Sequence, residues 1–457
     1  MNLMRFDIRS KSGTTFQTIP HRLYFGSHGL PFVLLFGLSV LLTSCRSAQD
    51  AKHTGVVEIT LWSMWSGQEE HNLERVLSLY EREHPGVHIR NLGAVSDDTK
   101  TIRALVAGAP PDVFTLSNPA YLGALAHNHA IRPLDSLLQH SALHEADFVP
   151  ASLRLCRYEN KLYGLPFLID DAALLWNKQA FTEAGLDPAL PPRTIEELAE
   201  YAVKLTTRDA NGKITRLGLR PPSDILLLFF LFGGRIIDPK AGRVTADDPG
   251  NVAGLTWYSD LIKRLGGIEK INAFTSGFGA NQGANNPFYT DKVAMVIDGE
   301  WNPYWVSRYA PQLQYGVSAI PPPAAQPQHI RTTMLGGNVF CIPTDSKHPE
   351  ESEKFLIWMQ SLEAQTQFAH DMNNVPNIRA ALHVPALREG TAFRRQYGIF
   401  CDLADSPNAA YFPAMPAASL YMNQLSNAVD KVLYGEMQPS LALAEVRERV
   451  QKEQDQQ

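Results

Sequence analysis

The chain has 457 residues, of which 44% are hydrophobic and 19% are charged, and its formal net charge is −6. A single hydrophobic core stops growing at roughly 250–300 residues, so this length excludes a one-core protein and predicts at least two lobes or domains. No Lys/Arg cluster offsets the negative charge, which excludes a nucleic-acid-binding protein, because recognition of phosphates needs a basic surface.

The N-terminal segment carries export signals. Residues 30–44, LPFVLLFGLSVLLTS, are uncharged and follow a stretch with four Lys or Arg residues. A spanning helix needs about 20 apolar residues, so this shorter run is typical of a secretory signal peptide. The run ends in LLTSC, which resembles the lipobox of bacterial lipoproteins, where cleavage before Cys precedes lipidation. We predict a signal peptide over residues 1–44, a lipid on Cys45 and a tether over residues 45–55; the alternative is an uncleaved anchor with an incidental Cys.

Strand and helix patterns alternate after this tether. Residues 56–61 and 87–89 are typical of strands, and NLERVLSLYEREHPG between them has apolar residues at helical spacing before a Pro-Gly stop. A second helix begins in KTIRALVAG, and residues 112–116 form a short strand pattern. This order predicts right-handed crossovers and a mostly parallel sheet, so the expected fold class is α/β.

The later segments continue the mixture. KLYGLPFLIDDAALLWNK has strand signals, and Thr194 with Glu197 forms a capping box before a helix. Residues 225–232, ILLLFFLF, are apolar on every side but too few to span a membrane, which predicts a helix buried between other helices. Residues 293–297 read as a buried strand that ends at Asp298-Gly299 and releases three aromatic residues into a turn.

Six segments, taken in order, match the patterns of one protein family. FYTDKVAMVIDGEW is similar to F-x-x-G-x-A-A-M-x-x-x-G-x-W, although Asp291 stands where Gly is usual and Val293 where Ala is usual. PRTIEELAEYAVKLT matches a second pattern, with Ile195 where Trp is common. The others are LYGLPFLIDDAALLWNKQAFTEAGLD, LFGGRIIDPKAGRVTADDPGNVAGLTWYSDL, LGGNVFCIPTDSKHPEESEKFLIWM and the C-terminal helix. Together they resemble the extracellular solute-binding proteins of sugar-type ABC importers, which include maltose-binding protein, over residues 56–451.

The resemblance implies a two-lobed periplasmic-binding-protein fold of type II, in which hinged α/β lobes close on a ligand in the cleft between them. It assigns to the first lobe residues 56–167 plus 331–372, and to the second lobe residues 168–330 plus 373–457. The expected crossings between the lobes are Pro166–Asp171, the Pro-rich connection Pro321–Gln328, and Asn373–Pro376. Turn residues at these places suit a hinge, where few residues absorb the change of backbone angles.

An aromatic residue directly after a strand indicates a carbohydrate site. In an open α/β sheet, ligands bind beyond the carboxyl ends of strands, and a rigid Trp face can cover the C–H face of a sugar at little entropic cost. Trp301 follows the strand that ends at Gly299 and matches the stacking Trp of the family; the alternative is a core position between sheet and helix. For Tyr304 and Trp305, core or rim positions are equally well supported.

Two loops of the first lobe supply further candidates. Trp65 and Ser66 lie in the loop after the first strand, and we expect them at the cleft. Ser117 and Asn118 follow the strand at residues 112–116, where the family places groups that hydrogen-bond sugar hydroxyls. Helix capping is the alternative for both, because Ser and Asn are favoured caps.

The expected crossings supply the remaining candidates. Asp170 stands where the family often has a cleft carboxylate, which can accept charge-assisted bonds from two vicinal hydroxyls; Asp171 is the alternative. Gly337 and Asn338 begin a strand, where glycine permits close approach of backbone to ligand, unless it forms a bulge or tight turn. Asn374 stands near the third crossing, where the family often has Gly.

The predicted function is that of a substrate-binding lipoprotein of an ABC transporter, which captures a sugar or oligosaccharide and delivers it to the permease. Its expected partners are the carbohydrate, the transmembrane subunits of the ABC permease and, through the lipid on Cys45, the cytoplasmic or outer membrane, with no nucleic acid and a monomeric state. No cofactor, metal site or catalytic residue is predicted, because the sequence has no P-loop, G-x-S-x-G or H-E-x-x-H motif.

Three alternatives stay open. The ligand could be a glycerol phosphate or another polyol, although the predicted cleft loops hold no Arg/Lys cluster for a phosphate. An anchored glycoside hydrolase would need two carboxylates about 5–10 Å apart, for which the candidates are Asp170 with Glu300 or Asp298. A structural surface lipoprotein would bind no small molecule.

Overall fold

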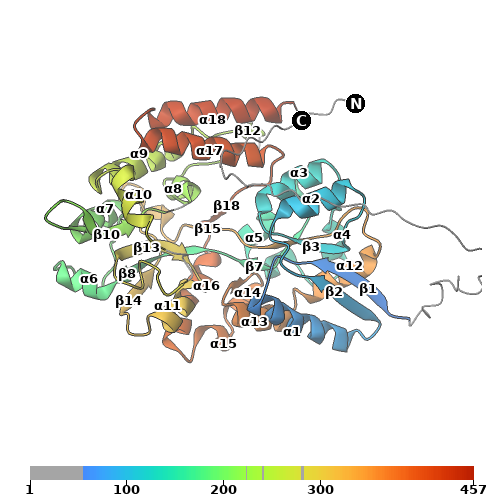
Figure 1. The fold of residues 1–457 in the computed structure, drawn as a ribbon. Coiled ribbons are helices and arrows are strands. Elements are labelled where there is room, and N and C mark those ends of the chain that lie inside the picture. The colour runs from blue at the N-terminus through green and yellow to red at the C-terminus, as the bar shows by residue number, and fades with distance from the viewer. Residues whose placement is uncertain (1–54, 223, 239–240, 279–282, 457) are drawn as a thin grey trace, which may run out of the picture. The chain divides into compact units, whose positions relative to one another are not determined.

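A computed structural model describes residues 55–222, 224–238, 241–278 and 283–456. The predicted signal peptide, Cys45 and the tether up to residue 54 lie outside the described residues. The unit Gly55–Gln457 contains two five-stranded sheets with helices packed around each, which confirms the predicted α/β class (Figure 1). None of the helices within these ranges is long and apolar enough to cross a membrane.

The first sheet has the strand order β2-β1-β3-β16-β6. Its strands are β1 (Val57–Trp62), β2 (Val87–Leu92), β3 (Val113–Leu116), β6 (Leu165–Pro166) and β16 (Val339–Cys341). β1 is parallel to β2 and to β3, and the helices α1 (Gln68–Glu83) and α2 (Asp98–Val106) connect them, as the alternating pattern predicts. β16 returns antiparallel to β3 and β6, so residue Asn338 enters the sheet at the edge where β3 ends.

The second sheet has the strand order β14-β8-β13-β10-β9. Its strands are β8 (Ala172–Asn177), β9 (Thr207–Arg208), β10 (Ile214–Arg220), β13 (Val293–Gly299) and β14 (Tyr315–Ser318). β13 contains the strand predicted at residues 293–297, and these five residues are all buried. A run without polar alternation is typical of a strand with both faces covered, and α8 and α9 are among the helices that pack around this sheet (Figure 1).

Short strands and helices complete the unit. The strands are β4 (Arg157–Tyr158), β5 (Lys161–Leu162), β7 (Leu168–Ile169), β11 (Ile237–Asp238), β12 (Arg243–Val244), β15 (Thr333–Leu335), β17 (Val375–Pro376) and β18 (Ala409–Tyr411). The α-helices are α3 (Leu122–His127), α4 (Asp135–Gln139), α5 (Pro150–Leu155), α6 (Lys178–Glu183), α7 (Ile195–Leu205), α8 (Ile225–Leu231), α9 (Pro249–Arg264), α10 (Ile268–Thr275), α11 (Asn302–Tyr309), α12 (Pro349–Trp358), α13 (Leu362–Met372), α14 (Arg379–Leu382), α15 (Pro385–Arg388), α16 (Ala392–Ala404), α17 (Ala418–Leu433) and α18 (Pro439–Gln454). The 3-10 helices are η1 (Pro119–Tyr121), η2 (Glu145–Asp147) and η3 (Pro327–His329).

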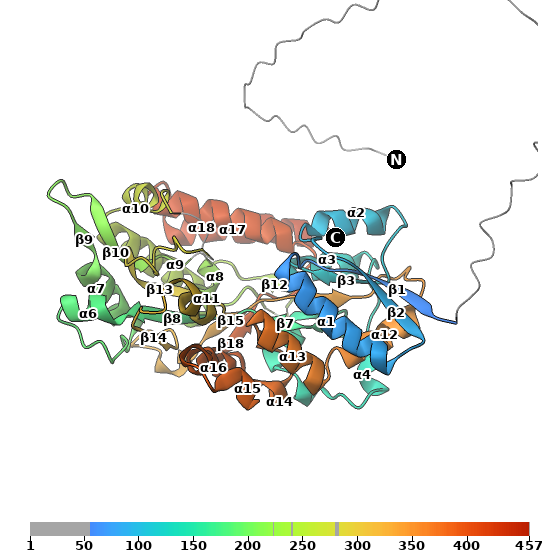
Figure 2. The ribbon, with the colours of Figure 1, turned by 60° about the horizontal axis from the view of Figure 1, so that its bottom comes forward.

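Two of the predicted helices show how sequence determines local structure. α8 lies at the apolar run 225–232 and is largely buried, as predicted, because it packs against α9. Thr194 caps α7 by accepting a hydrogen bond from the backbone N–H of Glu197, as the capping-box pattern predicts. The C-terminal helices α17 and α18 lie side by side (Figure 2).

Buried apolar side chains form two clusters. The first surrounds the first sheet, with Leu61 and Phe340, and extends to the second sheet through Leu175 and Val296; it includes side chains from α13 to α16. The second surrounds the second sheet and includes Leu217 and Met295 together with side chains from α17 and α18. The C-terminal helices are therefore divided between the two clusters. Side chains from α13 to α16 belong to the first cluster, and those from α17 and α18 belong to the second.

Three chain segments run together between the sheets. β7 pairs antiparallel with β17 through Ile169 and Val375. The backbone N–H of Asn338 donates to the carbonyl of Leu168 at 3.2 Å, and the N–H of Phe167 donates to the carbonyl of Asn338 at 2.9 Å. These bonds bring residues 167–170, 336–338 and 374–377 into one bundle.

The Pro-rich connection lies outside this bundle. The carbonyl of Pro322 accepts a hydrogen bond from the N–H of Ile195 at 3.0 Å, and the Glu196 carboxylate accepts one from Ala324 N–H at 3.1 Å. Pro321–Gln328 therefore contacts the start of α7, beside the second sheet. The segment that joins the other two crossings is residues 336–338, which corrects the expected position of the second crossing.

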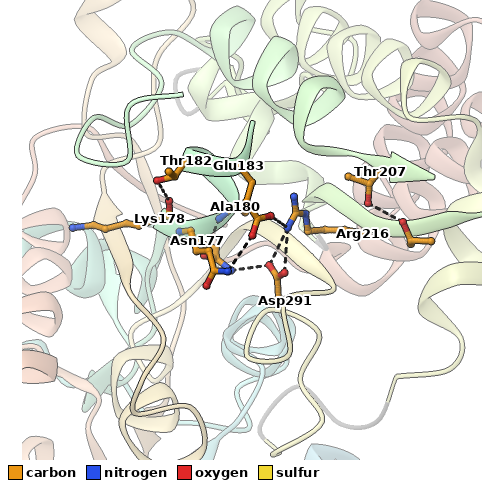
Figure 3. A network of polar contacts seen from close by, with 10 residues as sticks. Asn177, Lys178, Ala180, Thr182, Glu183, Thr207, Arg216 and Asp291 are labelled. Carbon is orange, nitrogen blue, oxygen red and sulfur yellow. Dashed lines mark hydrogen bonds and ion pairs between the residues drawn. The ribbon is translucent and has the colours of Figure 1, made fainter. Parts of the chain in front are cut away.

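Asp291 explains a departure from the family pattern. Its φ of 57° lies in the left-handed region, which glycine occupies readily and most other residues do not. The carboxylate of Asp291 accepts a hydrogen bond from Asn177 Nδ2 at 2.8 Å and lies 3.1 Å from Arg216 Nη1, which also contacts Glu183 at 2.8 Å (Figure 3). This network joins the turn before β13 to β8, β10 and α6, so the side chain gives contacts that glycine would lack.

The cysteines of the described part are unpaired. Cys156, Cys341 and Cys401, three of the four cysteines of the chain, are all buried and free. Burial raises the pKa of each thiol, that of Cys401 to about 12. All three are therefore neutral packing residues at physiological pH.

Candidate functional site

Three connections meet at one edge of the second sheet. β10 and β13 are parallel, so both end at this edge. β8 runs antiparallel to β13, and its first residue, Ala172, pairs with Gly299 at the end of β13. Residues just before β8 and just after β10 and β13 are therefore neighbours, at the place where ligands bind in open α/β sheets.

A pocket of about 220 Å³ lies at this edge. It is lined by Asp170, Asp171, Ala172, Pro222, Asp224, Leu227, Ile297, Asp298, Gly299, Trp301, Met334 and Gly336. Ligand pockets commonly enclose ~300–1,000 Å³, so this one suits a small ligand or one end of a longer one. A larger open groove, of about 660 Å³, follows α1 from Gly67 to Ser78, but side chains from this single segment line it and it encloses little.

Trp301 rests on the end of β13. A Cβ atom added at Gly299 would lie 2.3 Å from Cη2 of the Trp301 indole, so only glycine allows this contact. Trp301 is half-buried, and it lines the pocket immediately before α11 begins at Asn302. The strand therefore ends in Gly299 because the indole needs the space above that residue.

Asp170 and Glu300 are held by one amide. Asn374 Nδ2 donates to Asp170 Oδ1 at 3.0 Å and to Glu300 Oε1 at 2.6 Å. The Glu300 carboxyl also hydrogen-bonds Asp170, and its Oε2 accepts from the backbone N–H of Asp171 at 3.2 Å. Glu300 is fully buried and does not line the pocket, whereas Asp170 is partly exposed and does. Asp170 thus faces the pocket with Glu300 behind it.

Burial makes these carboxyl groups weak acids. Burial raises the pKa of Asp170 to about 6, although hydrogen bonds from Glu300 and Asn374 lower it in part. Burial and the charge of Asp170 raise the pKa of Glu300 and that of Asp171 well above the ordinary range. At neutral pH Asp170 is therefore the ionised member, and Glu300 is a neutral acid that can donate its proton in a hydrogen bond.

Two further carboxylates line the pocket in different roles. Asp224 caps α8 by accepting from the N–H of Leu226 at 2.9 Å. Asp298 lies 2.8 Å from Arg220 Nη2 in an ion pair that is mostly buried. No Lys or Arg occurs among the described residues that line the pocket, so the wall that a ligand meets is acidic.

Trp65, expected at the cleft, is a core residue instead. It is 3% exposed, and its ring lies 5.1–6.5 Å, between centroids, from the rings of Phe368, Phe167 and Phe340. Edge-to-face contacts of this kind stabilise a core. The expectation of a cleft position for Trp65 is wrong in this structure, because aromatic residues from three distant segments enclose it.

Other predicted residues of the first lobe lie apart from the pocket. Ser66 is exposed in the loop before α1. The Asn118 side chain accepts from the N–H of Ala120 at 3.1 Å and caps η1, which is the alternative that the sequence left open. The backbone N–H groups of Ser117 and Asn118 bond the buried carboxylate of Asp98. Neither Ser117 nor Asn118 lines the pocket.

Gly337 and Asn338 serve the crossing. A Cβ atom at Gly337, whose φ is 114°, would lie 2.1 Å from the Leu168 carbonyl oxygen, so glycine allows close approach of chain to chain. The Asn338 side chain contacts Met64 Sδ at 2.8 Å. Neither residue lines the pocket, although their neighbour Gly336 does. Contact of Asp170, Trp301 and Asn374 with a ligand stays a prediction.

Sequence reasoning missed part of the pocket wall. Pro222, Asp224, Leu227 and Met334 line the pocket without having been singled out. The first three follow β10, so the rule about carboxyl ends of strands could have found them once β10 was placed beside β13. Met334 comes from β15, whose position depends on pairing with the distant β18 and had no local signal. Across the residues described here, no group of three or more His, Cys, Asp or Glu residues is arranged to hold a metal ion.

Comparisons with known proteins agree with this architecture. Residues 66–366 match the family model described as bacterial extracellular solute-binding protein. A putative binding protein of Brucella abortus (strain 2308) is 25% identical over 422 residues, 90% of this chain and 95% of that protein. The galactooligosaccharide-binding protein of Bacillus subtilis (strain 168) is 22% identical over 91% of this chain and 95% of that protein. The solved structure of CpMnBP1 with mannotriose bound is 29% identical, covers 86% of this chain and 100% of its own, and has a TM-score of 0.73, which confirms the expected two-lobed fold.

Proposed function

This chain belongs to the family of bacterial extracellular solute-binding proteins, and we propose that it captures a sugar or short oligosaccharide for delivery to the permease of an ABC importer. Two of the similar proteins, CpMnBP1 with mannotriose bound and the galactooligosaccharide-binding protein, support a neutral saccharide. The family consists of binding proteins, so capture without chemical change is the expected activity.

One observation carries the proposal: Trp301 and Asp170 line the same pocket. A sugar ring presents C–H groups on one face and hydroxyl groups around its rim. An aromatic plane covers the first through dispersion and hydrophobic contact, and a carboxylate accepts hydrogen bonds from the second. The pocket therefore offers both groups that recognition of a sugar requires.

The charge of the pocket disfavours the phosphate alternative. In the described part of the chain, Asp170, Asp171, Asp224 and Asp298 line it, and of these four only Asp298 forms an ion pair, with Arg220. An anionic ligand would face the ionised Asp170 with no Lys or Arg among the described residues of the wall. A glycerol phosphate is therefore a poor candidate, whereas a neutral polyhydroxylated ligand pays no such electrostatic penalty.

The geometry also disfavours Asp170 and Glu300 as the catalytic pair of a glycoside hydrolase, and the other candidate, Asp298, is held in the ion pair with Arg220. Two catalytic carboxyl groups stand about 5–10 Å apart, one on each side of the scissile bond. Asp170 and Glu300 instead hydrogen-bond each other and share the amide of Asn374, with no room for a sugar between them. Glu300 is 0% exposed and cannot reach a substrate bond.

The proposal is tested by titrating the purified protein with mannotriose, maltotriose, galacto-oligosaccharide and glycerol phosphate, with tryptophan fluorescence and calorimetry as readouts. We expect binding of at least one neutral saccharide and none of glycerol phosphate. Trp301→Ala should weaken the binding by about 30-fold, as expected for an aromatic residue worth about 2 kcal/mol. Trp305→Ala is the matched control, because Trp305 lies one turn further along α11, stacked on Tyr309 and outside the pocket. Equal affinity of the Trp301 variant and the parent would refute the site.

We further infer that the exported protein is a monomer held by a lipid on Cys45. The support is the LLTSC sequence after an uncharged run of signal-peptide length. Cys45→Ala should abolish incorporation of a labelled fatty acid in cells and release the protein from the membrane fraction. Incorporation that persists in this variant would refute the anchor.

A further inference from the structure

Glu300 lies directly behind the pocket and has no role in binding by itself. Its carboxyl is fully buried, and its oxygens contact Asn374 Nδ2 at 2.6 Å and the backbone N–H of Asp171 at 3.2 Å. The third contact is the hydrogen bond with Asp170, which does line the pocket. Burial of a carboxyl group costs free energy unless the group is hydrogen-bonded. The role of Glu300 must therefore follow from its contacts with Asp170, Asp171 and Asn374.

The contacts of Glu300 join three separate parts of the chain. Asp170 belongs to the connection between β7 and β8, Glu300 follows β13, and Asn374 precedes β17. β7 and β17 are themselves paired, and the Tyr397 hydroxyl of α16 donates to the backbone carbonyl of Asn374. The Asn374 amide is thus fixed by its own backbone, and it in turn fixes both carboxyl groups.

The charges around Asp170 require such a support. Asp171 and Glu300 adjoin Asp170 as neutral acids, and the negative charge of Glu69, in the first turn of α1, raises the pKa of Asp170. From α16, Tyr397 and Cys401 face the cluster, and the pKa of each is raised, so both are neutral. Burial raises the pKa of Asp170, and the groups that lower it are two hydrogen-bond donors, Asn374 and the neutral acid Glu300.

The remaining charged groups are held by other partners. Asp298 is paired with Arg220, and Asp224 accepts from the backbone of α8. Arg394 on α16 donates to the carbonyl of His370 and lies over the ring of Phe393. None of these contacts involves the Asp170 carboxylate.

We propose that Glu300 and Asn374 are positioning residues, which hold the Asp170 carboxylate as a hydrogen-bond acceptor toward the pocket and thereby set the affinity for the ligand and its dependence on pH. This inference rests on the proposed function, since the ligand is taken to be a saccharide with hydroxyl donors. Glu300 donates its proton to Asp170 and Asn374 donates an N–H, so two bonds fix the direction of the carboxylate. The other lone pairs of Asp170 are left for hydroxyl groups of the ligand.

The test is the dissociation constant of the tightest binder among mannotriose, maltotriose and galacto-oligosaccharide, measured by calorimetry from about pH 5 to 8. For the parent, affinity should fall as the pH drops through about 6, because protonated Asp170 is a poorer acceptor. Glu300→Met removes the donor at similar length. We expect it to weaken binding by about tenfold at neutral pH and to move the midpoint of the pH profile upward by about one unit.

Two further variants separate positioning from simple structural support. Glu300→Gln keeps an N–H donor for Asp170 and one carbonyl oxygen that can accept from Asn374, but it loses the acceptor of the Asp171 N–H. Its affinity at pH 7.5 should therefore fall less than that of Glu300→Met, and its midpoint should not rise. Asn374→Ala removes the other donor and should raise the midpoint. If Glu300→Met does not fold, the pH profiles of Glu300→Gln and Asn374→Ala decide between positioning and structural support.

The outcomes are distinct. Glu300→Met and Asn374→Ala could lose affinity equally at every pH and keep the midpoint of the parent's pH profile. That result would show a structural role only and overturn the inference. A raised midpoint in Glu300→Gln would also overturn it, because that variant keeps the donor. Failure of the parent to bind any of the three saccharides would instead refute the proposed function, and the positioning role as stated would fall with it.

Discussion

Replacement of Asp291 by glycine tests whether the polar network at the amino end of β13 outweighs the strain of its left-handed backbone. Glycine relieves a conformation that costs an ordinary residue about 1–2 kcal/mol, and an Asp somewhat less. The variant also removes the acceptor of Asn177 Nδ2, and Asn177 is 2% exposed. An unsatisfied buried donor costs about 1–3 kcal/mol, and glycine loses about 0.5–1 kcal/mol more in backbone entropy.

The ion pair with Arg216 changes this balance little. Asp291 is 48% exposed there, and Arg216 keeps Glu183 as a partner, so the loss is at most about 1 kcal/mol. We expect Asp291→Gly to lower the free energy of unfolding by about 1–3 kcal/mol in urea titrations. Asp291→Ala should cost about 1 kcal/mol more, because it keeps the strain, and Asp291→Asn should cost the least. Saccharide affinity is the internal control, since the pocket lies at the other end of β13. A glycine variant as stable as the parent would refute the reasoning.

Two further predictions concern the core and the pocket. Trp65→Ala should reduce the free energy of unfolding by about 3–5 kcal/mol, as for other buried aromatic residues, and lost affinity at unchanged stability would contradict the core position. The pKa of Asp170 is raised from 3.8 to about 6 in the folded chain, so its protonation stabilises the fold below about pH 4, and that contribution disappears as the pH rises through about 6. Asp170→Asn should therefore flatten the pH dependence of the melting temperature between about pH 4 and 7, and a slope as steep as that of the parent would count against it.

Local patterns were sufficient where the local environment decides the structure. The five apolar residues from Val293 to Ile297 predict a strand covered on both faces, and the strand is there. The same reasoning places Trp301 at the sheet edge, because a residue after the carboxyl end of a strand has few other places to lie. The apolar run 225–232 likewise predicts a buried helix, since no face of it can meet water.

Local patterns failed where partners come from distant segments. Trp65 follows β1 much as Trp301 follows β13, yet Phe167, Phe340 and Phe368 enclose it. Nothing in the loop after β1 reveals those rings. The sequence did indicate a close backbone approach at Gly337, but the partner is the carbonyl of Leu168 and not a ligand. Glu300 was a candidate only as one of two catalytic carboxylates, because its hydrogen-bond partner Asn374 lies 74 residues further along the chain.

The position of Asp170 connects binding to the geometry of the crossings. It follows β7, whose partner β17 belongs to the same bundle, and its backbone carbonyl accepts from the N–H of Gly336 at 2.9 Å. Its side chain lines the pocket, so a ligand that bonds this carboxylate also acts on the segment whose backbone angles would change if the lobes moved. A ligand shifts such an equilibrium only by the difference between its affinities for the two states. Asn374 belongs to a second segment of the same bundle, so its amide, which orients Asp170, would move with that segment. Variants of Asn374 should therefore alter closure and affinity together.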